Sequence, residues 1–252
     1  MQGDRITAMT RTFADLHLCA NPKESEGLSK MASKAAKLGY TLMGVPLSPE
    51  KCEEEYSKLR NLDIADRGDF ASRVDLKPDS QNELIRLLRR LRRKVEVVCV
   101  MCENKEVARQ AAKDHRVDLL SFPSIDFRRN YFDRAEAELA SKSSAAFEFD
   151  IRPLLLSKGP SRVKLLSGLR REVTVALEFH VPIVVSSGVN EDWLLRKPRE
   201  MAVLAELAGL SETQALDAVS NSPHLIVKRN REKLCPGYVA PGIRIIKEGS
   251  DC

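Results

Sequence analysis

The feature that most constrains the fold is a repeated alternation of short apolar segments with longer amphipathic ones. The apolar segments have the length and composition of buried strands, and the amphipathic ones carry apolar residues at helical spacing. Seven strands are predicted at residues 13–18, 40–45, 72–76, 95–101, 117–122, 145–151 and 181–185. Strands that are each followed by a helix pair in parallel, and seven such units favour a closed barrel over an open sheet. The sequence therefore predicts an α/β fold, a TIM-like parallel β/α barrel of about seven strands.

Helices are predicted between these strands and after the last one. They span residues 22–38, 49–59, 79–94, 104–115, 133–141 and 160–179, with extra C-terminal helices at 198–208, 211–219 and after Pro223. The helix at 79–94 is clearly amphipathic, because Leu84, Leu88 and Leu91 fall on one stripe. We expect a flexible N-terminus at residues 1–10, a barrel domain at 11–231 and an extended tail at 232–252.

Composition limits the kinds of partner and compartment. Lys and Arg number 41 against 36 Asp and Glu, a net charge of only +5, so any nucleic-acid contact must come from local clusters. No apolar run reaches the roughly 20 residues of a membrane span, and Met1–Arg11 lacks the apolar stretch of a signal peptide. We expect a cytoplasmic protein without a membrane partner. Its six cysteines are then thiols, and the lone C-x-x-C of Cys99 and Cys102 lies in a predicted strand rather than in a zinc or redox site.

Two predicted strand ends carry polar residues where barrels place their chemistry. Asp15-Leu16-His17-Leu18-Cys19 resembles the opening H-x-H metal motif of the polymerase-and-histidinol-phosphatase superfamily, with a cysteine as its second ligand. Ser186-Ser187-Gly188-Val189-Asn190 stands where that superfamily shows an S-D-x-H-like motif, but it contains neither Asp nor His. A metal site for phosphoester hydrolysis needs convergent imidazoles and carboxylates. We therefore predict no catalytic residue, no metal ligand and no cofactor in this chain, and a buried His17 hydrogen-bonded near Asp15.

Basic residues gather in clusters that predict RNA contact. The clusters are Arg86, Arg89, Arg90, Arg92, Arg93 and Lys94; Arg128, Arg129 and Arg134; Arg196, Lys197 and Arg199; and Lys228, Arg229, Arg231 and Lys233, with single arginines at 73, 152 and 162. Any one cluster is ordinarily a solvated helix face. Arg128, Arg152 and Arg196, however, follow strand ends, where arginine can grip phosphates at the barrel mouth.

The predicted RNA contacts are Arg86, Arg90, Arg93, Arg128, Arg129, Arg152, Arg196, Lys197 and Arg199, together with Ser186 and Ser187. The two serines are included because Gly188 would let the backbone approach a phosphate; alternatively, they cap the following helical segment. Aromatic residues make up only 5% of the chain and no RRM, KH or zinc-knuckle signature is present. This favours recognition of RNA shape and backbone over sequence. The arginines at 86, 90 and 93 could instead meet an acidic face of a partner protein.

Several segments together resemble one family, archaeal ribonuclease P protein component 3 and its eukaryotic members, over about residues 12–231. They are Phe13–Leu16, Ala36–Tyr40, Val117–Pro123, Ala146–Phe149 with Arg152–Leu155, Pro182–Ser187, Arg196–Arg199, Ala208–Glu212 and Ala218–Ser220. The resemblance implies a barrel that has lost its metal site. It also implies a complex with the catalytic RNA, with component 2 and with other protein subunits that removes 5′ leaders from precursor tRNA, with magnesium held by the RNA. Two alternatives remain: a phosphoesterase using Asp15, His17 and Cys19 with an unusual metal, and a protein scaffold that never touches RNA.

Overall fold

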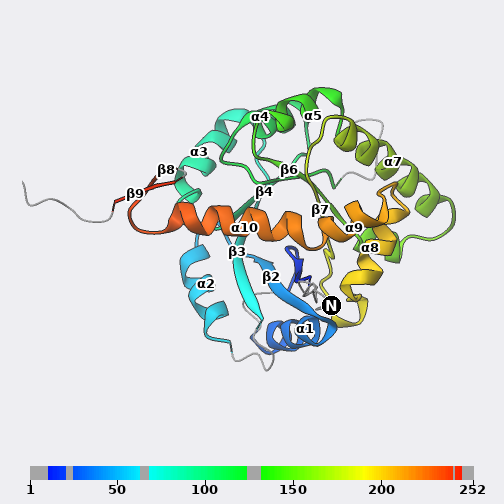
Figure 1. The fold of residues 1–252 in the computed structure, drawn as a ribbon, viewed down its shortest axis with the longest axis horizontal. Coiled ribbons are helices and arrows are strands. Elements are labelled where there is room, and N and C mark those ends of the chain that lie inside the picture. The colour runs from blue at the N-terminus through cyan, green and yellow to red at the C-terminus, as the bar shows by residue number, and fades with distance from the viewer. Residues whose placement is uncertain (1–10, 21–24, 63–67, 124–131, 241, 246–252) are drawn as a thin grey trace, which may run out of the picture.

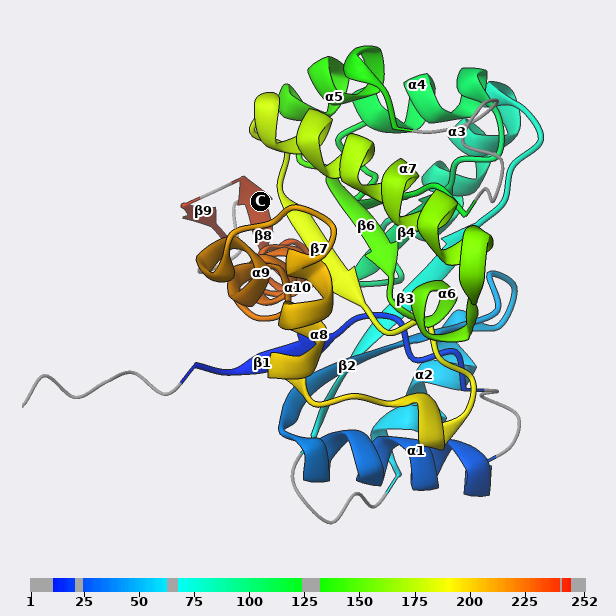
Figure 2. The same ribbon diagram turned by 90° about the vertical axis from the view of Figure 1, so that its right-hand side faces the viewer.

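The computed structural model describes residues 11–20, 25–62, 68–123, 132–240 and 242–245. Its centre is a parallel sheet of seven strands paired in chain order (Figures 1 and 2). The strands are β1 (Phe13–Asp15), β2 (Tyr40–Pro46), β3 (Asp69–Leu76), β4 (Val97–Met101), β5 (Leu119–Ser121), β6 (Ala146–Asp150) and β7 (Ile183–Ser186). Each of them overlaps a predicted strand, so the predicted number, order and direction of strands are confirmed.

The first and last strands meet only at their carboxyl ends, which leaves the barrel nearly closed. Leu18 and Val189 form an isolated parallel bridge, and the Cys19 amide donates to the carbonyl of Val189 at 2.9 Å. Further toward the amino end, the Ala14 amide donates instead to the carbonyl of Val219 at 3.0 Å. The C-terminal helical region therefore supplies a backbone partner for β1 that an eighth strand would otherwise provide.

Helices cover the outside of the sheet. They are α1 (Ser25–Leu38), α2 (Cys52–Arg60), α3 (Gln81–Leu91), α4 (Lys105–Lys113), α5 (Arg134–Ser141), α6 (Arg152–Leu156), α7 (Gly159–Glu178), α8 (Pro198–Glu206), α9 (Glu212–Ala218) and α10 (Asn221–Leu234), with a 3-10 turn η1 at Asp192–Leu194. Side-chain caps begin several of them, as at Ser80, Asn104 and Asp133. The short helix α6 was not predicted, and it joins β6 directly to α7.

The inside of the barrel has an apolar layer and a polar one. Ala14, Leu16, Leu42, Ala71, Val97, Cys99, Leu119, Ala146 and Val184 pack together with Ile226 and Val227 of α10. Strand side chains alternate in direction, so the residues one period later in β3, β6 and β7 also point inward. These inward residues are Arg73, Glu148 and Ser186, and all three are buried.

Helix α10 crosses the amino end of the barrel and closes it (Figure 1). Asn230 is fully buried and donates to the Glu96 carbonyl and to the Asp118 carboxylate, both at 2.7 Å. Arg229 donates to Asp118 at 2.9 Å, and Arg231 pairs with both Glu96 and Asp69. These two arginines of the last basic cluster are thus not a solvated face, because their guanidinium groups bind acidic residues at the amino ends of strands.

The chain after the barrel differs from the predicted extended tail. Helix α10 continues to Leu234, beyond the expected boundary at residue 231. Strands β8 (Tyr238–Ala240) and β9 (Ile243–Arg244) then form an antiparallel pair. In the part of the chain that the structure describes, no helix has the length and apolar character to span a membrane.

The contacts of Asn230 predict a large stability effect from a small substitution. Asn230→Ala removes one donor from a buried carbonyl and one from a buried carboxylate, so we expect a loss of about 2–4 kcal/mol in the free energy of unfolding. Asn221→Ala, at the exposed start of the same helix, is the control and should stay within about 0.5 kcal/mol of wild type. Urea unfolding measures both. Equal effects of the two substitutions would contradict the closing role of α10.

Candidate functional site at the barrel mouth

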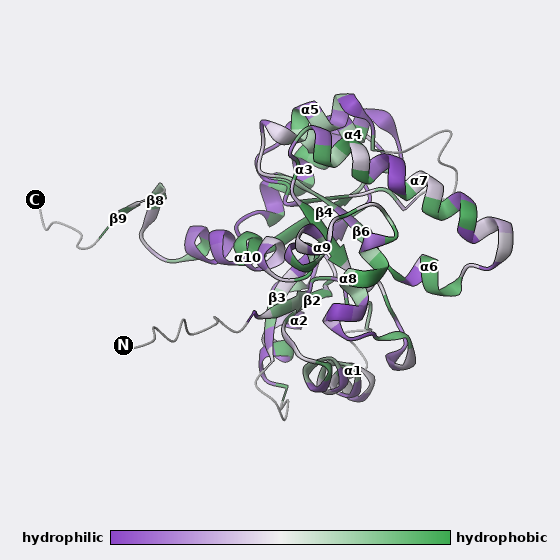
Figure 3. Ribbon diagram, turned by 45° about the vertical axis from the view of Figure 1, so that its right-hand side comes forward, coloured by the Kyte–Doolittle hydropathy of each residue, from purple (hydrophilic) through white to green (hydrophobic). Residues whose placement is uncertain are grey.

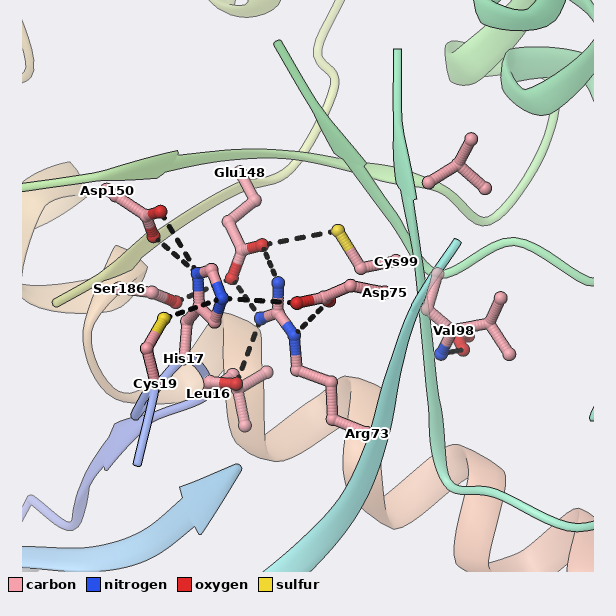
Figure 4. A network of polar contacts seen from close by, with 12 residues as sticks. Leu16, His17, Cys19, Arg73, Asp75, Val98, Cys99, Glu148, Asp150 and Ser186 are labelled. Atoms are coloured by element: carbon pink, nitrogen blue, oxygen red, sulfur yellow. Dashed lines mark hydrogen bonds and ion pairs between the residues drawn. The ribbon is translucent and has the colours of Figure 1, made fainter. Parts of the chain in front are cut away.

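The polar layer near the carboxyl ends of the strands is organised by one buried cation. Arg73 of β3 has no exposed surface, and its two terminal nitrogens each donate to one carboxylate oxygen of Glu148 at 2.7 Å (Figure 4). Its Nε donates to Asp75 at 2.7 Å, and one terminal nitrogen also reaches the Leu16 carbonyl at 2.9 Å. Such a two-pronged contact is the strongest that a guanidinium makes with a carboxylate. The arginine therefore ties together β3, β6 and the chain just after β1.

His17 stands beside this cation and is held between two carboxylates. Its Nδ1 lies 2.9 Å from an Asp150 oxygen and its Nε2 lies 3.2 Å from an Asp75 oxygen. Burial and the nearby Arg73 guanidinium lower the pKa of His17, but Asp150 and Asp75 outweigh them and raise that pKa well above 6.5. Each ring nitrogen thus faces a carboxylate, which is the arrangement of an imidazolium that donates from both nitrogens.

The predicted environment of His17 is confirmed in part. The side chain is buried and hydrogen-bonded as expected. Asp15, however, does not contact its ring. One Asp15 oxygen accepts the backbone amides of His17 at 3.1 Å and of Ser187 at 3.0 Å, while the other has no hydrogen-bond partner. Burial raises the pKa of Asp15.

This arrangement does not fit the metal ion that the superfamily motif implies. A metal needs a neutral imidazole and free carboxylate lone pairs, but here the guanidinium and the imidazolium use those lone pairs. Within the described residues, no group of three or more His, Cys, Asp or Glu is placed to hold a metal ion. Cys19 lies 3.1 Å from Nε2 of His17, so this nitrogen is shared between a thiol and a carboxylate.

The two cysteines of the C-x-x-C are equally unsuited to metal or redox chemistry. Both are fully buried, and burial raises the pKa of each thiol well above its usual range. A thiol in such surroundings stays protonated, and only the thiolate binds metal or attacks a disulfide. The Cys99 thiol lies 3.5 Å from Glu148, and the Cys102 thiol lies 3.5 Å from the Val100 carbonyl.

The loop after β7 also faces inward, which corrects one prediction. Ser186 donates to Glu148 at 2.6 Å and Ser187 donates to the His17 carbonyl at 3.2 Å, and both serines are buried. Gly188 has a φ of +62°, and a Cβ there would lie 2.5 Å from Asp150 Cγ. The glycine thus admits a carboxylate of the protein itself and not a ligand. We withdraw Ser186 and Ser187 from the predicted RNA contacts, because their hydroxyls are used inside the barrel.

Comparison with known proteins is consistent with this geometry. The family model described as RNase P subunit p30 matches residues 12–234. The chain belongs to this family. Ribonuclease P protein component 3 of Methanosarcina barkeri is 31% identical over 94% of this chain and 97% of its own length, and the same protein of Methanosarcina mazei is 30% identical over 95% and 97%. A chain in the cryo-EM structure of an archaeal ribonuclease P with mature tRNA shares the fold at a TM-score of 0.75, with 20% identity over 94% of this chain and 100% of that chain.

The cations predicted to bind RNA are dispersed over this p30 family member. Arg152 follows β6 at the mouth, is half-buried, and has an Nε without a hydrogen-bond partner. The loop after β7 instead returns over α1, and the Arg196 carbonyl accepts from Tyr40, the first residue of β2. The expectation that Arg152 and Arg196 flank one loop at the mouth is therefore wrong, since Arg196 lies near the amino end of β2. Lys197 and Arg199 are exposed beside it.

The remaining predicted cations lie on the outer wall or outside the described residues. Arg86, Arg90 and Arg93 are exposed on and just after α3, but Arg86 lies 3.7 Å from Glu83 and Arg90 lies 3.6 Å from Glu50. Arg128 and Arg129 fall outside the residues that the structure describes. RNA contact by these five arginines stays a prediction.

Replacing Arg73 tests whether it holds the polar layer together. Arg73→Met leaves Glu148 buried without its cation and Asp75 with His17 alone, so we expect a loss of about 3–5 kcal/mol in the free energy of unfolding at neutral pH. Arg73 lowers the pKa of both carboxyls, so their contribution is present above the ordinary carboxyl pKa and lost as pH falls through the folded value. The difference in the free energy of unfolding between Arg73→Met and wild type should therefore become smaller as the pH falls below about 4.

Urea unfolding at neutral and acidic pH measures this, with Arg73→Met combined with Glu148→Gln as the control. Glu148→Gln removes the buried carboxylate charge that Arg73→Met leaves without a partner, and it should recover part of the lost free energy of unfolding. A cost under about 1 kcal/mol for Arg73→Met, with no dependence on pH, would contradict the assigned role.

Proposed function

We propose that the chain is a non-catalytic protein subunit of ribonuclease P, the RNA-based endoribonuclease that removes 5′ leaders from precursor tRNA. In this role it binds and organises the catalytic RNA, together with component 2 and other protein subunits, in a cytoplasmic complex. The chain itself holds no cofactor, and the magnesium ions of the reaction belong to the RNA. Precursor tRNA reaches the chain through the complex.

One observation carries the non-catalytic part of this proposal. At the mouth of the barrel, where a hydrolase of this fold places its metal, the carboxylates are neutralised by Arg73 and by the His17 imidazolium. Neither the guanidinium nor the imidazolium can bind and activate a water nucleophile as a metal ion does. The relatives named ribonuclease P protein component 3, which match nearly the whole chain, support the assignment to the complex.

The alternative phosphoesterase needs Asp15, His17 and Cys19 to act together. Asp15 bonds only backbone amides and has a raised pKa, while both nitrogens of the His17 ring are committed. No observation in the described residues favours this alternative.

Reconstitution tests the proposal. The chain, mixed with its own organism's ribonuclease P RNA and the companion protein subunits, should restore cleavage of precursor tRNA at a moderate magnesium concentration where the RNA alone is inactive. The chain alone should cleave nothing. His17→Ala should lower the melting temperature, because it removes the donor of Asp150 and leaves Asp75 with Arg73 alone, but the reconstituted cleavage rate should stay near wild type.

The results of these experiments distinguish a non-catalytic subunit from a phosphoesterase. A His17→Ala complex that assembles normally and yet fails to cleave would overturn the non-catalytic role. If His17→Ala does not fold, His17→Gln, which retains one donor, serves in its place. Purified wild-type chain with one equivalent of bound zinc, manganese or iron would favour the phosphoesterase.

A further inference from the structure

The segment from Ile151 to Arg171, here called the α6–α7 arm, holds six cations and not a single carboxylate. The cations are Arg152, Lys158, Arg162, Lys164, Arg170 and Arg171. The whole chain has a net charge of +5, so the other 231 residues together carry −1. Residues 84–95 also hold six cations and no carboxylate, so positive charge is concentrated in the arm and in that segment around α3.

The arm projects from the barrel on the side of the mouth. Helix α6 begins two residues after the carboxyl end of β6, and from Gly159 to Ser167 no residue of α7 is buried. Burial begins at Gly168 and Leu169, where α7 starts to pack against the barrel. Figure 3 shows α6 and the adjoining end of α7 extending beyond the other helices.

Three exposed cations of the arm have no carboxylate partner in the part of the chain that the structure describes. Among the described residues, Lys158, Arg162 and Lys164 take part in no ion pair. The Arg162 Nε donates to the Ser157 carbonyl at 2.7 Å, which holds the guanidinium between α6 and α7. On α3, by contrast, Arg90 faces Glu50, and just beyond that helix Lys94 pairs with Glu53 at 2.9 Å.

Helical spacing distributes these cations around the tip of α7. Arg162 precedes the buried Leu169 by seven residues, so both lie on the same face of α7. At Leu169 this face packs against the barrel, whereas at Arg162 it is exposed to solvent. Lys164 and Arg171 are also seven residues apart and share a different face. Cations on two faces of a projecting helix can contact phosphates on both sides of a nucleic-acid groove. A single small anion would contact only one of these faces.

We infer that the α6–α7 arm is an RNA-docking surface that contacts the phosphate backbone of the ribonuclease P RNA. This inference rests on the proposed function and assigns the RNA contact to a surface that sequence reasoning covered only at Arg152. The arm has no aromatic residue, whereas protein interfaces are enriched in Tyr, Trp and Phe. Uncompensated cations without aromatic anchors favour a polyanion, which they bind through release of its counterions.

The test compares two triple variants of the full chain, each assembled with the companion protein subunits. The first is Lys158→Ala, Arg162→Ala and Lys164→Ala. The matched control is Lys58→Ala, Arg109→Ala and Lys142→Ala, three exposed cations that each pair with a carboxylate at 2.7–3.6 Å. Fluorescence anisotropy with the transcribed ribonuclease P RNA gives the affinity between about 50 and 200 mM salt. Gel filtration reports whether the companion subunits remain bound.

We expect the arm variant to bind the RNA at least about tenfold more weakly at low salt and to flatten the slope of log affinity against log salt by up to about three. The control should change the slope by less than about one. An arm variant that matches the control would overturn the inference while leaving the proposed function intact. So would a variant that keeps its salt slope but loses a companion subunit, since the arm would then be a protein interface. A wild-type complex without salt-dependent RNA binding would instead refute the proposed function.

Discussion

The interior of this barrel depends on a guanidinium buried among carboxylates. Removing charges from water costs several kcal/mol per ion, and only good geometry with further hydrogen bonds offsets that cost. Arg73 meets the condition because its donors reach both Glu148 oxygens, Asp75 and the Leu16 carbonyl. The contacts join β3 to β6, which are not neighbours in the sheet, so the cation acts across the barrel and complements the backbone ladder around it.

The same contacts limit what the carboxylates at the barrel mouth can bind. The carboxylates that face the mouth are compensated within the protein, so they have little remaining capacity to polarise a water or bind a metal. Helix α10 closes the opposite end with its own compensated charges, through Arg229, Asn230 and Arg231. With both ends of the barrel occupied by compensated charges, the cations left for a partner lie on its outside, on α3, at the start of α8 and on the α6–α7 arm.

Sequence reasoning recovered the strands because their apolar runs are local signals. It missed Arg73 as the central cation, although the pattern Ser72-Arg73-Val74-Asp75-Leu76 places Arg73 and Asp75 on one face of a strand whose other face is apolar. That alternation was the available signal. The partner, Glu148, is 75 residues away and could not be deduced from local pattern.

The errors among the surface residues have a related cause. A run of basic residues looks alike whether it faces solvent or an acidic neighbour, so Arg229 and Arg231 could not be distinguished from free cations without knowing that α10 crosses the barrel. Arg196 was misplaced because the length of the loop after β7 does not reveal that it returns along α1. The arm was partly readable from its lack of carboxylates, but α6 is five residues long and too short for helical periodicity to show.

The buried network and the α6–α7 arm are mechanically connected at one point. Asp150, the last residue of β6, accepts from His17 and packs against Gly188, and two residues later the Arg152 amide donates to the Ser187 carbonyl at 3.0 Å. The root of the arm is thus held by the same groups that neutralise the mouth, while its tip has no buried residue. A projecting helix keeps a fixed direction only if its base is rigid. In this chain the charges at the mouth of the barrel therefore hold the base of a segment that carries six cations and no carboxylate.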